Sequence, residues 1–151
     1  MNSRLRYRQG RAAPTRQRGT AALEFALISV AFFSLLIGIM EMGRVMFYWN
    51  TAAEATRLGA RVAVVCDIDS PAIKTKMETM LSILQDGNID VTYSPPGCDV
   101  ASCTDVTVSI VNVTVDTLIP FVPISIAMPS FATTLPRESL DSVNGTNPTC
   151  S

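Results

Sequence analysis

Residues 18–40 read RGTAALEFALISVAFFSLLIGIM, and this stretch decides the fold. Only Arg18 and Glu24 are charged, and the other residues are mainly Ala, Leu, Ile, Val, Phe and Met. As an α-helix, about 20 residues at ~1.5 Å each cover roughly 30 Å, the thickness of the hydrocarbon core of a bilayer. The segment from Thr20 to Met40 is therefore predicted to cross a membrane once. Glu24 then needs an explanation, because a charged side chain within a membrane span is costly.

The charges of the chain are divided unevenly around this span. Six of the 12 basic residues are arginines at or before position 18, ahead of any acidic residue. From Thr20 onward the chain has six basic and 13 acidic residues, which gives that part a net charge of −7. An arginine-rich arm can bind nucleic acid, but directly before a membrane span it is better explained by the positive-inside bias. We therefore expect residues 1–19 to be a basic cytoplasmic leader, the C-terminal part to lie outside the cytoplasm, and no nucleic acid to be bound.

A cleavable secretory signal peptide is the competing interpretation, because it also has a basic region followed by an apolar one. The apolar run is too long for such a peptide, and no small-x-small site precedes a polar mature start. Instead, the residues after Met40 keep a helical composition. These features favour a retained membrane helix.

Histidine is absent from the sequence. Its absence removes the commonest general base, the usual nitrogen ligand of zinc, and the Ser-His and Cys-His nucleophile pairs. The sequence contains no nucleophile motif either. We therefore expect no enzymatic activity, no catalytic residue and no cofactor.

The membrane helix is predicted to continue as one rod to about Val65. No proline or turn cluster interrupts residues 41–65, and two i,i+3 pairs of opposite charge, Glu41 with Arg44 and Glu54 with Arg57, support a helix. We interpret the first pair as an interfacial ion pair with no special role. The three aromatic residues at 47–49 are of the kind found at the membrane–water interface.

Small residues are frequent on the second half of this rod, and they would let a neighbouring surface approach closely: Ala52, Ala53, Ala55, Gly59, Ala60 and Ala63. That surface is either the chain's own domain or a neighbouring subunit.

The rest of the chain is predicted to form a small α+β head with one further helix and an antiparallel sheet of about three strands. Ser70 and Pro71 are a good helix start, and apolar residues then follow at helical spacing until Gly87. After Gly87 the apolar pattern has a period of two, which indicates strands at about 89–93, 106–115 and 131–138. The alternation changes phase at Ile110 and Val111, which predicts a bulge or bend there. The proline-rich residues 118–129 are expected to be a loop or an edge segment.

All four cysteines lie beyond the span, and hence in an oxidising compartment if the predicted topology holds. Four cysteines allow three pairings, among which the sequence alone does not choose. Cys98 and Cys103 enclose a short loop and are the easiest pair, and Cys66 with Cys150 would then pin the C-terminal tail to the end of the long helix. A zinc site would need all four thiolates, and their spacing is unlike two CxxC knuckles, so we expect no metal.

The beginning of the span resembles the processing site of type IV pilin-like prepilins. In that class a membrane aspartic peptidase cuts after a glycine, and a glutamate five residues into the mature chain is a hallmark. Gly19, Thr20 and Glu24 match this pattern, and the Glu24-Phe25 pair is most similar to the Flp, or tight-adherence, branch. The resemblance implies cleavage between Gly19 and Thr20 by a prepilin peptidase, with Glu24 as a subunit assembly contact.

The resemblance extends to the N-terminal domain of TadE-like proteins. The start EFAL at 24–27, the membrane exit with Glu41 and Arg44, and the helix with Arg57 and Arg61 follow that family's pattern. The similarity covers about the first 65 residues well and the rest loosely. The chain is too long for the Flp major pilin, so the resemblance implies a minor pilin or pseudopilin.

We therefore expect three parts: a leader at 1–19, a TadE-like transmembrane and extended helix at 20–65, and an extracytoplasmic head at 66–151. The expected function is assembly of a tight-adherence (Flp) pilus from the bacterial inner membrane. The expected partners are the prepilin peptidase, other pilins or pseudopilins, the pilus assembly platform and the lipid bilayer. The alternative is a membrane-tethered adhesin or pilus-tip subunit whose head binds a surface.

Overall fold

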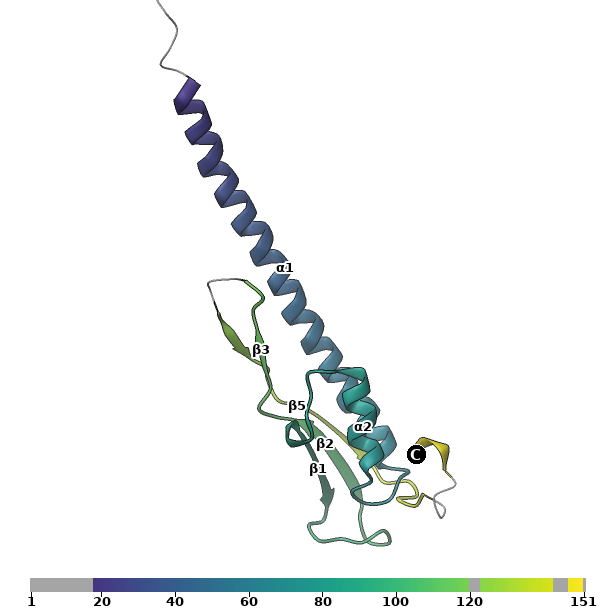
Figure 1. The fold of residues 1–151 in the computed structure, drawn as a ribbon. Coiled ribbons are helices and arrows are strands. Elements are labelled where there is room, and N and C mark those ends of the chain that lie inside the picture. Colours follow the sequence, from purple (N-terminus) through teal and green to yellow (C-terminus); the bar gives the residue numbers. More distant parts are fainter. Residues whose placement is uncertain (1–17, 120–122, 143–146, 151) are drawn as a thin grey trace, which may run out of the picture. The chain divides into compact units, whose positions relative to one another are not determined.

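The computed structural model describes residues 18–119, 123–142 and 147–150 (Figure 1). The leader at 1–17 therefore lies outside the described residues. The described chain has the α+β composition predicted from the sequence, with one long helix, one further α-helix and short antiparallel sheets. It divides into two compact units, an N-terminal one that ends at Ile39 and a head that begins at Met40.

Helix α1, Arg18–Ala63, is continuous for 46 residues. Its apolar first half fits a membrane span by length and composition, and the large apolar side chains from Leu23 to Met42 are all exposed. Val45 is the first buried apolar residue of the helix, at 1% exposure. The helix therefore begins to contribute to a core only inside the head.

The small residues of α1 lie against the chain's own head. Ala52, Ala55 and Ala60 are fully buried, and a Cβ added at Gly59 would lie 2.4 Å from the Met77 sulfur. Of the two surfaces expected to cover this side of the helix, the head's own core is the one observed. Trp49 also packs against that core together with Tyr48, so Phe47 alone of the aromatic group stays exposed.

Helix α2, Pro71–Met80, is shorter than predicted. It begins after Ser70 with proline in its first turn, as expected, but the predicted end at Gly87 is wrong. Leu81 donates the last helical hydrogen bond to the Met77 carbonyl and then adopts an extended conformation. Leu84 is buried by a turn instead. The predicted helix was too long because helical spacing of apolar residues does not distinguish a helix from a compact buried turn.

Three strands form the main antiparallel sheet, in the order β1-β2-β5. They are β1 (Ile89–Ser94), β2 (Asp105–Ile110) and β5 (Phe131–Pro136). Alternate residues of the central strand β2 are buried, namely Val106, Val108 and Ile110. The opposite face is polar, and Thr92, Thr107 and Thr134 lie side by side across it. The sheet therefore packs one apolar face into the core and leaves one face in water.

A second sheet was not predicted. Strand β3 (Thr114–Asp116) pairs with β4 (Ser125–Ala127), which lies in the proline-rich segment that we expected to be a loop or an edge. The predicted bend occurs after β2, where Asn112 has a φ of 56° in the left-handed region. The change of phase therefore marks the passage between two sheets rather than a bulge within one strand.

Two disulfides close the head. Cys66 bonds Cys150 across 84 residues, and Cys98 bonds Cys103 across five. Cys66 follows the end of α1, and Cys150 belongs to the short helix η2 (Pro148–Cys150). The last described residues are thus joined covalently to the end of the long helix.

Candidate functional site

The residues that match a processing site lie in the first two turns of α1. Gly19, Thr20, Glu24 and Phe25 are all exposed, and Phe25 reaches 73%. The Gly19–Thr20 peptide bond lies among the first described residues of α1. A Cβ added at Gly19 would meet no other atom within 4 Å. The structure thus brings these four residues together on one short, accessible segment.

The Glu24 carboxylate makes no hydrogen bond or ion pair with any residue that the structure describes. Four residues separate it from Thr20, which corresponds to about 6 Å along the helix axis. An amino group created at Thr20 would therefore lie on the same short stretch of α1. The carboxylate is available to a positive charge from another chain.

A second group of polar residues lies where α1 enters the head. Arg44 donates two hydrogen bonds to one carboxylate oxygen of Glu41, from Nη2 at 2.8 Å and from Nε at 3.1 Å. The guanidinium carbon also lies 5.7 Å from the centre of the Tyr48 ring. The pair is thus half-buried against the head rather than free in solvent.

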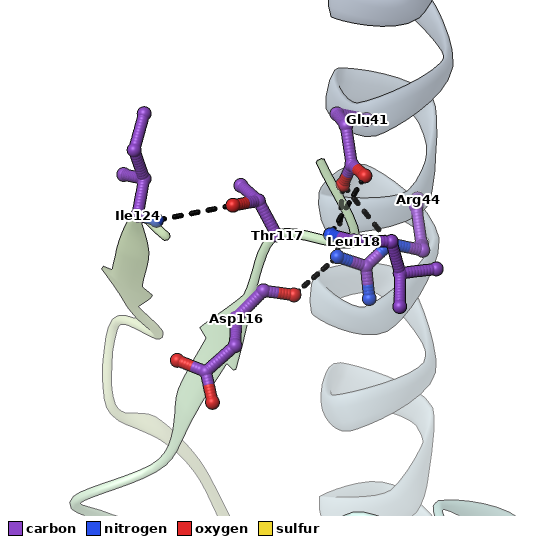
Figure 2. Close-up of polar contacts among 6 residues, drawn as sticks. All are labelled: Glu41, Arg44, Asp116, Thr117, Leu118 and Ile124. Atoms are coloured by element: carbon purple, nitrogen blue, oxygen red, sulfur yellow. Dashed lines mark hydrogen bonds and ion pairs between the residues drawn. The ribbon is translucent and has the colours of Figure 1, made fainter. Parts of the chain in front are cut away.

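This ion pair holds the β3–β4 hairpin, as Figure 2 shows. The other carboxylate oxygen of Glu41 accepts a hydrogen bond from the Leu118 backbone N–H at 2.9 Å. Arg44 Nη2 also donates to the backbone carbonyl of Asp116. Both contacts use backbone groups at the end of β3 that no neighbouring strand pairs. Glu41 and Arg44 therefore fasten the hairpin to α1, in addition to pairing with each other.

This contact was not predicted from the sequence, where Glu41 and Arg44 form an ion pair without a special role. Their partners, Leu118 and Asp116, are 77 and 72 residues away in the sequence. The position of the pair directly after the predicted membrane span could have indicated this contact. Charged groups that become half-buried there need further hydrogen bonds.

A third polar cluster joins the C-terminal segment to the end of α1. The Ser142 backbone N–H donates to the Asp67 carboxylate at 3.0 Å, and the Asp67 backbone N–H donates to the Ser142 hydroxyl at 3.2 Å. Hydrogen bonds to the carboxylate from the backbone N–H and the hydroxyl of Ser142 stabilise its charged form and lower the pKa of Asp67 below its ordinary value. The Val64 carbonyl accepts from three successive backbone N–H groups, at 138, 139 and 140. The cluster reinforces the Cys66–Cys150 disulfide beside it.

Residues 19–61 match the family model described as "TadE-like protein". The matched range contains both the Gly19–Phe25 segment and the Glu41–Arg44 pair. No curated protein and no solved structure matches the chain.

Proposed function

Because residues 19–61 match the TadE-like family model, we propose that the chain is a TadE-like protein of the tight-adherence pilus system and that it acts there as a minor pilin or pseudopilin. In this proposal α1 anchors the protein in the bacterial inner membrane with the arginine arm in the cytoplasm and the head outside. The observation that carries the proposal is the coincidence of the TadE-like match with an exposed, apolar helix that has a carboxylate in its second turn.

The prepilin peptidase cuts between Gly19 and Thr20 in this proposal, which gives Thr20 a new ammonium group. An ionised carboxylate within the membrane is costly unless it is paired or lies near the interface. The Thr20 ammonium of one subunit and Glu24 of the next would satisfy each other, and only one axial register of two neighbouring helices permits that pairing. The exposed position of Glu24, and the absence of a described partner within its own chain, support this role.

In this proposal the head is attached rigidly to the second half of α1. The Cys66–Cys150 disulfide, the Glu41–Arg44 contacts and the buried small residues hold the head against the second half of α1. A force applied to α1 would therefore be transmitted directly to the head. The proposal assigns no catalytic role and no cofactor to any of these residues.

The test compares Glu24→Gln with Glu54→Gln in a host that produces the pilus, with and without its prepilin peptidase. Both carboxylates are exposed on α1, and the Glu54–Arg57 pair at 2.6 Å is a surface ion pair worth about 0–1 kcal/mol. The matched control therefore changes the same chemistry at a position that the proposal does not use.

Two measurements give the result. N-terminal sequencing of the membrane-extracted wild type is expected to start at Thr20 when the peptidase is present and at Met1 when it is absent. Glu24→Gln is expected to insert into the membrane normally and to be lost from sheared pili and assembly complexes, whereas Glu54→Gln stays in them. A Met1 start in the presence of the peptidase would overturn the processing step, and normal incorporation of Glu24→Gln would overturn the assembly role.

A further inference from the structure

Strand β1 is an outer strand of the three-stranded sheet, and its outer edge has backbone groups without partners (Figure 1). The Val111 N–H donates to the Asn88 carbonyl at 2.9 Å, so the even-numbered residues along β1 point their backbone groups toward β2. Val91 and Tyr93 therefore point theirs away from the sheet, and no hydrogen bond joins these groups to any residue that the structure describes. Neither a proline nor a charged side chain at positions 91 and 93 protects this edge from pairing.

Strand β5 is the other outer strand, and its outer edge has the same property. The Arg137 N–H donates to the Thr104 carbonyl at 2.9 Å, so the odd-numbered residues along β5 face β2. Ala132 and Thr134 therefore point their backbone groups outward, where the described part of the chain offers no partner. Pro136 also has its nitrogen on this outer side, which is where a strand tolerates proline.

The two edges match when β1 of one copy lies parallel to β5 of another, with Val91 beside Thr133. In a parallel ladder a residue bonds to the two neighbours of the residue beside it. Val91 would then donate to the Ala132 carbonyl of the other copy and accept from its Thr134 N–H. The backbone groups that each copy leaves without partners would thus satisfy those of the next.

One more hydrogen bond extends this ladder at each end, to the Ile89 carbonyl and from the Tyr93 N–H. Beyond these, the Ile89 N–H is already bonded to the Asp86 carbonyl, and Pro136 has no N–H. The donors that the two edges lack therefore fall outside the ladder, and every bond within it can form.

The same register continues both faces of the sheet. On the polar face, Thr92 would lie beside Thr134 of the other copy, which extends the row of threonines that already crosses the sheet. On the core-facing side, a cavity of about 230 Å³ adjoins the outer edge of β1. It lies between that edge and the start of α2, with Ile73 and Lys74 among its lining residues, and so leaves room for side chains of an added strand.

We propose that β1 of one copy pairs in parallel with β5 of a second copy, which joins the sheets of successive heads edge to edge. The partner is a second copy because β1 and β5 both run antiparallel to β2, and their edges match in register and side-chain pattern. Parallel pairing keeps every head in one orientation, apart from the ~20–25° twist between neighbouring strands.

Copies that a single span anchors in one membrane need such a common orientation. Antiparallel pairing of β1 with β1 would instead turn one head by half a turn in the plane of the sheet. This inference deepens the proposed function and rests on its membrane anchor, but not on processing or on Glu24.

The test is disulfide cross-linking of the full chain in membranes of a host that produces it. Thr92→Cys and Thr134→Cys are combined, because the proposed register brings these positions of neighbouring copies together. Within one chain β2 lies between them, which separates their strands by about 10 Å, too far for a disulfide. The four native cysteines are already paired, so the new thiols are the ones that react. Thr92→Cys combined with Thr79→Cys is the matched control, because Thr79 is exposed on α2.

The T92C/T134C variant is expected to give a ladder of cross-linked multimers, at least about tenfold more than T92C/T79C, because a disulfide needs Cα atoms within about 7 Å. Each single-cysteine variant is expected to give no multimer. Ala132→Pro removes an N–H that the chain's own sheet does not use, and it is expected to abolish the ladder in the T92C/T134C background.

A cross-linked dimer of Thr92→Cys alone would indicate antiparallel pairing of β1 with itself and would overturn the inference. Equal cross-linking of T92C/T134C and its control, a product with a different protein, or a ladder that persists in Ala132→Pro would also overturn it. If Ala132→Pro fails to fold by circular dichroism, the comparison of the double-cysteine with the single-cysteine variants decides. Alkaline carbonate extraction separates the two proposals. Absence of the ladder from protein that stays in the membrane overturns this inference alone, whereas release of the protein would remove the membrane anchor as well.

Discussion

Removing the Cys66–Cys150 disulfide is expected to destabilise the head more than any other change to its cross-links. The chain-entropy model relates the effect of a disulfide to the length of the loop that it closes. For the sequence separation of 84 between Cys66 and Cys150 it gives about 4.6 kcal/mol, and for the separation of 5 between Cys98 and Cys103 about 2 kcal/mol. The predicted difference of about 2.5 kcal/mol is large compared with the ~5–15 kcal/mol by which domains are stable.

The measurement is urea unfolding of the full chain in detergent micelles, followed by the fluorescence of Trp49. This residue packs against the core of the head, so its emission reports the unfolding of that core. The C66A/C150A variant is expected to lower the midpoint by about 2 M, at a typical dependence of ~2 kcal/mol per M. The C98A/C103A variant is the control and is expected to shift it by about half as much.

Equal shifts in the two variants, or a larger shift in C98A/C103A, would refute this reasoning. Either result would mean that the conformations of the loop closed by Cys66 and Cys150 are already restricted in the unfolded chain, for example by the membrane helix. Adding reductant to the wild type checks the sum of the two effects, because it opens both loops and keeps every sulfur atom in place.

Acid is expected to weaken the Asp67–Ser142 cluster. The pKa of Asp67 is lower in the folded chain than its ordinary value of 3.8, so its contribution to stability is present above pH ~4 and disappears as the pH falls through the folded pKa. Asp67→Asn should therefore show a smaller loss of stability than wild type between pH 5 and pH 2 in the same unfolding assay, and an unchanged slope would contradict the assignment. A second prediction concerns close packing on α1: Gly59→Ala, whose Cβ would lie 2.4 Å from the Met77 sulfur, should cost about 1–3 kcal/mol. Gly43→Ala on the same helix meets no atom within 4 Å and should gain up to about 1 kcal/mol, so equal effects of the two substitutions would count against the observed packing.

Much of the fold was predictable because it depends on local pattern. The apolar run without proline predicts α1, and alternation of Val106, Val108 and Ile110 with polar residues predicts the central strand β2. The loop between Cys98 and Cys103 is short enough to suggest its own pairing, which leaves only one pairing for the other two cysteines.

The features that were not predictable depend on distant residues. Strand β4 contains no strong strand pattern and forms because β3 pairs with it after the chain has bent at Asn112. Helix α2 ends at Met80 because Leu81 is buried in an extended conformation. The place of Leu81 in the core depends on all the elements that pack there, and not on the local sequence. The i,i+3 spacing of Glu41 and Arg44 already explains their opposite charges as an ion pair. Nothing in the neighbouring sequence indicates that they also form hydrogen bonds with the backbone of Asp116 and Leu118.

The covalent link between Cys66 and Cys150 has a consequence for how each copy is made. The ribosome completes α1 and its row of small residues long before it reaches β5 and the segment that ends at Cys150. Until those last residues have emerged, Cys66 has no cysteine to pair with at position 150, and Val64 lacks the three N–H groups that it accepts from. The cross-link that closes the head can therefore form only after almost the whole chain has been synthesised. A stop codon ten residues early would release a chain that keeps its long helix but lacks this cross-link, and its head would be about 4.6 kcal/mol less stable by the same chain-entropy model.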